Sequence, residues 1–262
     1  MYLLIDTETT GLDVSTSRIW EVGMMLVDDN WQYLKGFSVR LKDEEILTQL
    51  KERAATLPNV PRLEDIETTA VSLDNGLKMM TAFVEECEPR AVLAYNAKFD
   101  EPFVKAMIEG NLFSFTRGGH LLCTLPWYCM MEHVPSNYGF KCWKLGHLAL
   151  DYGIAVDPKL LHGAYQDIDL ARKLAEASGY KVNQIIKFAE EPWVILRAIT
   201  EKPWIDGGAS SAIAKELGFS WEKAKGMEKP IEKAWVKRIK ESFVAEESNK
   251  IKDKIPFRII KE

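Results

Sequence analysis

The opening twelve residues constrain the fold of this chain more than any other stretch. Four apolar residues at positions 2–5 run directly into Asp6, and a turn containing Gly11 follows. So short an apolar run, closed by a glycine turn, is typical of a buried β-strand rather than a helix. Because side chains alternate along a strand, we expect Asp6 and Glu8 on one face, about 6 to 7 Å apart along the backbone.

The negative charges of two carboxylates at the end of a buried strand need to be neutralised. They repel each other, and one takes up a proton unless a divalent cation with oxygen ligands neutralises the pair. Asp6 and Glu8 therefore favour a metal site. A strand end whose acids simply face water is the alternative, and a D-x-E spacing alone does not exclude it.

The composition predicts a globular protein with one full core and a smaller second unit, because the 262 residues are 47% hydrophobic and 28% charged. No apolar run reaches membrane-spanning length, and Asp6 interrupts the apolar start before a signal-peptide core could form. We therefore expect a cytoplasmic protein without a membrane partner.

Charge is divided unevenly along the chain. Residues 1–180 hold 17 Lys and Arg against 26 Asp and Glu, whereas residues 181–262 hold 17 against 13. A cation-requiring acidic site thus belongs to the first part. If the partner is a nucleic acid, the basic second part is the expected source of phosphate contacts, with an ordinary solvated surface as the alternative.

The four cysteines, among them Cys87, include no C-x-x-C pair, which favours reduced, buried thiols over a disulfide framework. A zinc site is the alternative, although its spacing fits no common zinc finger. Its ligands would be Cys123, Cys129, His133 and Cys142.

Periodicity and turn signals predict a mixed sheet with helices packed on it. Residues 28–30 are typical of a hairpin connection, so the first three strands are expected to be consecutive and antiparallel. A helix before the next strand implies a crossover. The elements expected after the opening strand are strands over 18–27 and 31–41, helices over 42–57 and 73–87, and a strand over 91–95.

The stretch from Asn96 to Phe103 resembles a capped helix start, with Asn96 after a strand and Pro102 near the first turn. It places Asp100 at the sheet edge where Asp6 and Glu8 emerge. An early-helix acid favoured by the helix dipole is the alternative. Residues 111–140 show no clear period and are expected to form a long irregular connection around a short helix near 126–133.

A further helix is expected over 143–151, and another begins after His162. In the second helix the buried stripe includes Ala164, and Asp167 lies within the first turns. Asp169 is about 200° round the helix from Asp167 and is expected to face solvent.

Three motifs in this order carry a family resemblance. They are Asp6-Thr7-Glu8-Thr9-Thr10-Gly11-Leu12, Asn96 with Phe99-Asp100, and His162-x-Ala164-x-x-Asp167. The chain resembles a DnaQ-like 3'-5' exonuclease of the DEDDh group, the family of the epsilon proofreading subunit, oligoribonuclease and RNase T. The resemblance covers about residues 1–178. It implies an α/β fold of the ribonuclease H-like type, with a five-stranded mixed sheet flanked by helices.

The resemblance also implies the roles of individual residues. Two Mg²⁺ or Mn²⁺ ions would be bound by Asp6, Glu8, Asp100 and Asp167, with Asp6 bridging both. His162 would be the general base, since a histidine that titrates near neutrality can take a proton from the attacking water. The substrate-binding residues would be Thr9, Gly11, Leu12, Asn96 and Phe99, with Leu12 wedged beside the terminal base and Phe99 either near that base or in the core.

The expected reaction is metal-dependent release of nucleoside 5'-monophosphates from single-stranded 3' ends. DNA is favoured over RNA because the motif spelling looks closest to the proofreading branch. An RNA-trimming enzyme is one alternative, and a non-catalytic nucleic-acid-binding or polymerase-associated module is another. A DNA polymerase or another replication protein is the expected protein partner.

We expect an exonuclease domain over residues 1–180 and a small α+β accessory domain of unknown role over residues 192–262. The second has the order β-α-β-β-α-β, the split βαβ arrangement. Trp204, Trp221 and Trp235 are expected to stiffen its small core, with a base-stacking surface as the alternative.

Overall fold

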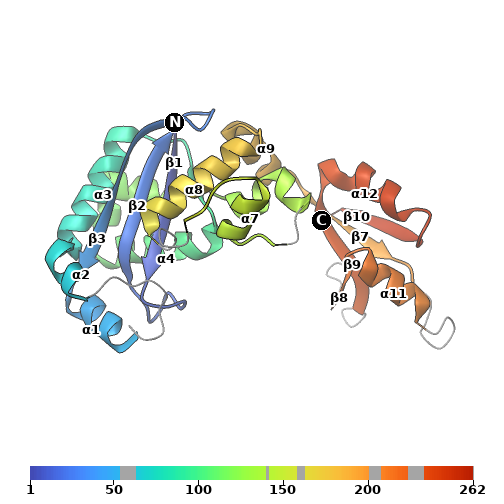
Figure 1. The fold of residues 1–262 in the computed structure, drawn as a ribbon, viewed down its shortest axis with the longest axis horizontal. Helices are drawn as coiled ribbons and strands as arrows, with labels where there is room; N and C mark the ends of the chain where they lie inside the picture. The colour runs from blue at the N-terminus through green and yellow to red at the C-terminus, as the bar shows by residue number, and fades with distance from the viewer. Residues whose placement is uncertain (54–62, 140–141, 158–162, 201–207, 224–232, 262) are drawn as a thin grey trace. The chain divides into compact units, whose positions relative to one another are not determined.

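The computed structural model describes residues 1–53, 63–139, 142–157, 163–200, 208–223 and 233–261. The chain forms two compact units, Met1–Ala189 and Glu190–Glu262 (Figure 1). No helix in these ranges is long and apolar enough to cross a membrane.

The first unit is built on a mixed six-stranded sheet with the order β4-β3-β2-β1-β5-β6. Strands β1 to β3 are consecutive and antiparallel, as expected. Strand β5 pairs in parallel with β1, and β6 in parallel with β5. The strands are β1 (Tyr2–Thr9), β2 (Ile19–Val27), β3 (Tyr33–Lys42), β4 (Val71–Ser72), β5 (Val92–Ala94) and β6 (Trp127–Cys129).

The sheet has one strand more than the five that the resemblance implies. Val71 and Ser72 pair in parallel with Leu41 and Lys42, so a two-residue strand extends the β3 edge. So short a strand has no periodic pattern of its own and depends on its neighbour for its hydrogen bonds.

Helices cover both faces of this sheet, as the mixed topology predicts. Helix α8 crosses β1 and β2 on one face (Figure 1). The α-helices are α1 (Glu44–Arg53), α2 (Leu63–Thr69), α3 (Leu73–Cys87), α4 (Ala97–Gly110), α5 (Arg117–Thr124), α6 (Met130–His133), α7 (Leu145–Asp151), α8 (Ala164–Ala177) and α9 (Val182–Glu190).

Alternation along β1 divides the core into two layers. Leu3 and Ile5 pack into one hydrophobic cluster together with residues of α1 to α5. Tyr2 and Leu4 pack into another, which includes Ile168 of α8 and residues of α9. The even-numbered positions of β1 therefore face α8, and the odd-numbered positions face the opposite layer.

Residues 111–140 are more regular than expected, because α5, β6 and α6 lie within them together with short 3-10 helices at Phe113–Phe115 and Pro135–Gly139. Helix α5 packs closely on α3. A Cβ added at Gly118 would lie 1.8 Å from the Thr81 carbonyl oxygen, so only glycine permits this approach.

The second unit has the expected β-α-β-β-α-β order, and its sheet runs β10-β7-β9-β8 with antiparallel neighbours. Its core contains Trp235 as a partly buried member, whereas Trp221 is 51% exposed. Trp204 lies outside the described residues. The elements are β7 (Trp193–Ala198), α11 (Ala209–Glu216), β8 (Ser220–Lys223), β9 (Lys233–Lys240), α12 (Val244–Ile251) and β10 (Phe257–Lys261).

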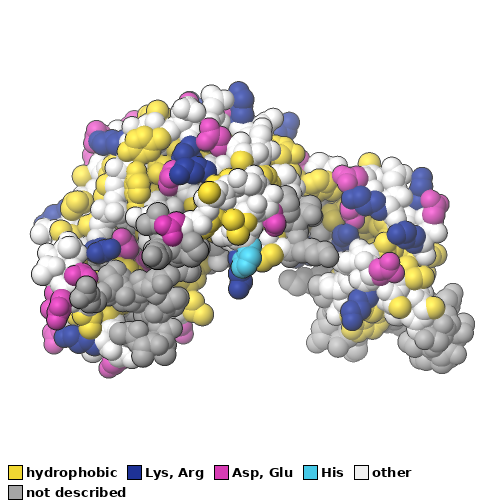
Figure 2. All heavy atoms as spheres, viewed as in Figure 1, with side chains coloured by type: hydrophobic (Ala, Val, Ile, Leu, Met, Phe, Trp, Pro, Cys, Tyr) yellow, Lys and Arg dark blue, Asp and Glu magenta, His cyan; other side chains and the backbone are white. Residues whose placement is uncertain are grey.

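The surface carries mixed charge on the face that Figure 2 draws. Side chains of Lys and Arg are interspersed there with those of Asp and Glu among the described residues. The uneven charge of the two halves of the sequence therefore does not appear on this face as a patch of one sign.

Candidate active site

Three carboxylates meet where β1 approaches α8. One carboxylate oxygen from each of Asp6, Glu8 and Asp167 lies within 4.8 Å of the other two. Asp6 and Glu8 occupy even-numbered positions of β1 and so face α8, as the alternation predicted. All three side chains are half-buried. Oxygen-only ligands in this number are those that Mg²⁺ and Mn²⁺ prefer.

Gly23 of β2 allows the first turn of α8 to reach the sheet. It pairs with Asp6 across the β1–β2 ladder. A Cβ at this position would lie 2.6 Å from the carbonyl carbon of Ala164 and 2.8 Å from the backbone nitrogen of Tyr165. The missing side chain thus sets the height of α8 above the strand, and with it the position of Asp167.

Replacing Gly23 by alanine is expected to displace the start of α8 and lower the rate of phosphodiester cleavage by about a hundredfold, because a 1 Å misplacement of a catalytic group has that effect. The apparent affinity for Mn²⁺, measured by calorimetry, should fall in parallel. Gly110→Ala is the matched control, since a Cβ there meets nothing within 4 Å. A Gly23→Ala enzyme with wild-type Mn²⁺ affinity would contradict this account of how Asp167 is placed.

Glu21 is a further carboxylate at the same place, which the sequence analysis did not identify. It is 6% exposed and stands opposite Glu8 in the β1–β2 register. Its carboxylate accepts a hydrogen bond from the backbone N–H of Ala164 and lies 3.6 Å from the Arg40 guanidinium. Burial raises the pKa of Glu21, and these two contacts oppose the rise. Glu21 therefore ties β2 to the first residue of α8.

Asp100 is held on the opposite side of β1. Its side chain is 3% exposed, and Oδ1 accepts hydrogen bonds from the Thr7 backbone N–H at 3.0 Å and from Thr7 Oγ1 at 2.8 Å. It is not a member of the group of three carboxylates, but it lines the same cavity as Asp6 and Glu8. Thr7 is thus the residue that fixes Asp100 to the strand.

Asn96 precedes α4, but its side chain makes no capping hydrogen bond, contrary to expectation. With φ −126° and ψ 70° its backbone is not in the usual N-cap conformation, and its carbonyl accepts the N–H groups of Phe99 and Asp100. Asn96 and Phe99 instead line the cavity that holds the acids. Pro102 lies inside α4, at its sixth residue.

Repulsion and burial together make this site hard to ionise. Burial, followed by the charges of Asp100, Asp167 and Glu8, raises the pKa of Asp6 well above its ordinary value. Burial and then Asp167 raise the pKa of Glu8 to about 8. Burial raises the pKa of Asp100 to about 7, against the lowering effect of the Thr7 hydrogen bonds. A bound cation would relieve this penalty, so the donor set fits a divalent metal.

The cavity around the acids measures about 1010 Å³. The start of α7 and the residues before it form a wall that the sequence analysis treated as ordinary helix. This wall contributes Trp143, Lys144 and His147, of which Lys144 and His147 are exposed. An aromatic ring and a lysine side chain in one cavity with a cluster of acids suit a nucleotide with its phosphate.

Thr9 at the end of β1, and Gly11 and Leu12 after it, were expected to contact the substrate but do not line the cavity. The Thr9 hydroxyl donates a hydrogen bond to the Gly11 carbonyl at 2.7 Å, which shapes the turn. Leu12 is 87% exposed, next along the chain. An apolar side chain presented in this way is available to a ligand.

His162 lies outside the described residues, which resume at Gly163. Asp169 is not part of the carboxylate group, but it is partly buried rather than solvent-facing as expected, and it lines a small cavity together with Asp167. Its carboxylate pairs with Lys173 at 2.7 Å and with Arg172 at 3.2 Å, and its side chain is 33% exposed.

The zinc alternative gains no support. The cysteines are free thiols, and His133 Nδ1 accepts a hydrogen bond from the Cys129 backbone N–H. In the part of the chain that the structure describes, the side chains close enough together to bind one metal ion in a group of three or more are those of Asp6, Glu8 and Asp167.

Comparison with known proteins finds a relative in sequence. The chain is 27% identical to the DNA polymerase III subunit epsilon of Treponema pallidum (strain Nichols) over 176 residues, which cover 67% of this chain and 73% of that protein. No protein-family model matches the sequence. The chain resembles the DnaQ-like DEDD exonucleases.

Solved structures support the fold of this DnaQ-like chain. The E. coli exonuclease I complex with a dT13 oligonucleotide superimposes with a TM-score of 0.61 at 10% identity, covering 96% of this chain and 68% of that one. An apo exonuclease I gives a TM-score of 0.54 at 10% identity, and the match covers 80% of this chain and 51% of that one. The DnaQ-like chain therefore spans between about half and two thirds of these exonuclease I chains. The ribonuclease H-like fold expected from the motifs is confirmed.

Proposed function

We propose that single-stranded DNA 3' ends are the substrate of this 3'-5' exonuclease, a hydrolase of phosphodiester bonds. The observation that carries the proposal is the meeting of Asp6, Glu8 and Asp167 within 4.8 Å at one side of a cavity of about 1010 Å³. The products proposed are nucleoside 5'-monophosphates.

Two divalent ions, Mg²⁺ or Mn²⁺, would supply charge neutralisation on the attacking and leaving oxygens of the phosphodiester. Asp6, Glu8 and Asp167 are the residues that would hold them, with Asp100 supporting from the position that Thr7 fixes. We assign proton removal from the attacking water to His162, on its place in the motif.

The part of the cavity lined by Trp143 and Lys144 suits a polynucleotide strand. In this proposal the Trp143 ring stacks on a base, and Lys144 neutralises a phosphate. Exonuclease I has been crystallised with dT13 and dA16 oligonucleotides, and the curated relative is a subunit of DNA polymerase III. These relatives favour DNA over RNA and make a polymerase a candidate partner.

Matched DNA and RNA oligonucleotides of one sequence, labelled at their 5' ends, test the choice of substrate. We expect the DNA to be shortened faster under identical metal and salt concentrations. A large preference for RNA would replace this proposal with an RNA-trimming activity. Absence of nucleotide release from both, with Mg²⁺ and with Mn²⁺, would favour a non-catalytic binding module.

The second unit is proposed as an accessory domain of the exonuclease. Its residues belong to the part of the chain with the basic excess, which suits contacts to phosphates. An ordinary solvated surface remains the alternative reading of that excess.

A further inference from the structure

The loop between β1 and β2, residues 10–18, is fastened to α1 at two points by one side chain. Gln49 Oε1 accepts a hydrogen bond from Thr10 Oγ1 at 2.5 Å, and Gln49 Nε2 donates to the Thr16 carbonyl at 3.0 Å. Thr10 Oγ1 in turn accepts the Arg18 backbone N–H at 2.8 Å. A single carboxamide thus connects both ends of the loop to the helix.

Between these two points the loop is already a defined turn. Asp13 Oδ1 accepts hydrogen bonds from the Ser15 backbone N–H and hydroxyl, and the Asp13 carbonyl accepts the backbone N–H of Ser17. The turn carries Leu12, which is 87% exposed. Its shape is local, so its attachment to α1 decides where Leu12 points.

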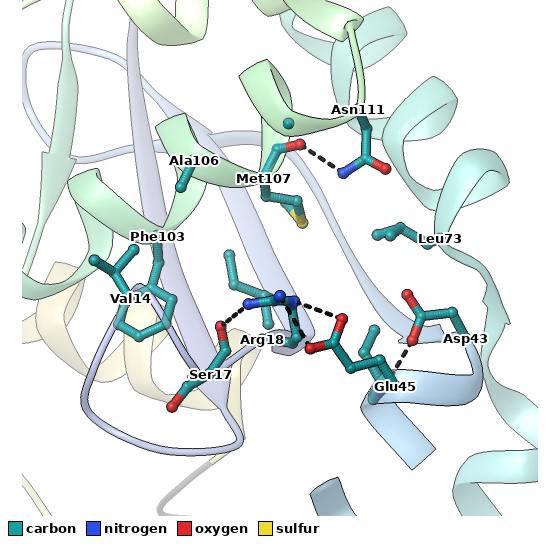
Figure 3. Close-up of a pocket in the computed structure, with 13 residues that line it drawn as sticks. Val14, Ser17, Arg18, Asp43, Glu45, Leu73, Phe103, Ala106, Met107 and Asn111 are labelled. Atoms are coloured by element: carbon teal, nitrogen blue, oxygen red, sulfur yellow. Dashed lines mark hydrogen bonds and ion pairs between the residues drawn. The ribbon is translucent and has the colours of Figure 1, made fainter. Parts of the chain in front are cut away.

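A cavity lies beside the loop, between it and α4. A cavity of about 350 Å³ lies between the loop residues Val14 and Arg18 and the α4 residues Phe103 and Met107 (Figure 3). Side chains that line this cavity lack packing partners across it. The hydrogen bonds of Gln49 are therefore a direct attachment of the loop to α1.

Burial distinguishes the two polar links between the loop and α1. The Arg18 guanidinium pairs with Glu45 at 3.0 Å, but the two side chains are 38% and 50% exposed, and an exposed pair contributes little (Figure 3). Thr10 is fully buried, and Gln49 is half-buried. Loss of a hydrogen bond there leaves a polar group without water to replace its partner.

We propose that Gln49 is a positioning residue that acts through Thr10 and Thr16 to hold Leu12 against the terminal nucleoside of the strand. The inference rests on the proposed function, because a contact between Leu12 and the terminal nucleoside requires that a nucleic-acid strand binds in the site. It extends the substrate site to α1, which contributes none of the residues that line the cavity around the acids.

Kinetics of Gln49→Leu and Thr10→Val test this inference. Each change removes the hydrogen bond between the two side chains while keeping similar volume. We expect the KM for a single-stranded oligonucleotide to rise about tenfold in each variant, with kcat changed less than about twofold, because the acids stay in place. The KM change of the double variant should be smaller than the product of the two single changes, since the two residues share one hydrogen bond.

Thr48→Ala is the matched control on the same helix, because its hydroxyl bonds only the Glu44 carbonyl one turn earlier. Its KM should stay at the wild-type value. An unchanged KM in both Gln49→Leu and Thr10→Val would overturn the inference. So would a fall of kcat equal to the change in KM, which indicates general disruption rather than a displaced loop.

Hydrogen exchange of the backbone amides in residues 11–17 measures how firmly the loop is held, independently of enzymatic activity. Exchange should be faster in both variants than in the wild type and in Thr48→Ala, and equal rates would overturn the inference. A wild-type enzyme that releases no nucleotide would refute the proposed function. Faster exchange in the variants would still support the attachment by Gln49.

Discussion

Replacing Asp6 by asparagine is expected to lower the rate of nucleotide release by about a thousandfold or more. The reason is that a catalytic cation supplies several kcal/mol of charge stabilisation and each 1.36 kcal/mol corresponds to a factor of ten in rate. Asp6 belongs to the group of three carboxylates and faces α8 from β1. Steady-state release from a labelled oligonucleotide checks the rate. Asp74→Asn on α3 is the control, because Asp74 is exposed and pairs only with Lys78.

The same substitution should stabilise the metal-free protein at alkaline pH. The pKa of Asp6 is raised in the folded state, as are those of Glu8 to about 8 and Asp100 to about 7. The unfolded carboxyls titrate near 4, so the folded state is increasingly penalised as pH rises from about 4 to about 8.

Thermal unfolding in EDTA should therefore give Asp6→Asn a higher Tm than the wild type at pH 8, and nearly the same Tm at pH 4. Added Mn²⁺ should raise the Tm of the wild type more than that of the variant. Asp6→Asn with wild-type activity, or with a lower Tm at pH 8, would remove Asp6 from the metal site.

His162→Ala is expected to lose about 10²- to 10⁴-fold in rate, the contribution of a positioned general base. Asp169→Ala, two residues beyond Asp167, should lose less than about twofold. The Asp169 carboxylate pairs with Lys173 and Arg172 and is not part of the group formed by Asp6, Glu8 and Asp167. Single-turnover rates of the two variants under one set of metal concentrations measure the difference.

The pH dependence provides the second readout for His162. The wild-type rate should fall at acidic pH as the imidazole takes up a proton, and the substitution should remove that titration from the residual activity. Metal-bound water also titrates, so a fall in rate at acidic pH does not by itself identify His162. The comparison of His162→Ala with Asp169→Ala is therefore the more decisive test. If His162→Ala keeps its activity and Asp169→Ala loses it, the residues of the motif have been assigned wrongly.

The relative positions of the proposed metal-binding acids could be predicted from sequence because they follow backbone periodicities. Strand alternation puts Asp6 and Glu8 on one face, and the helical period separates Asp167 from Asp169. Helix α3 was predicted at its observed bounds because its apolar residues recur at helical spacing, and in the structure the Ser72 side chain accepts the Asn75 N–H at its start. These features depend on neighbours along the chain.

Features that depend on tertiary contact escaped the sequence analysis. Glu21 was missed, although a single acid in a nine-residue strand that is buried throughout is a usable signal. Gly118 and Gly119 weaken the helical propensity of α5, but their packing against Thr81 and Phe113 requires glycine. Lys144, in the wall before α7, meets the acids only through the fold.

Metal-dependent cleavage from the 3' end is tested most directly with single-stranded DNA labelled at its 5' end. The shortened strands and the released products are identified in the presence of Mn²⁺ and in the presence of EDTA. Because Asp6, Glu8 and Asp167 form one acidic group, we predict shortening one nucleotide at a time from the 3' end, with nucleoside 5'-monophosphates released only when the metal is present. Internal cleavage, release from the 5' end, or an equal rate in EDTA would contradict the claim.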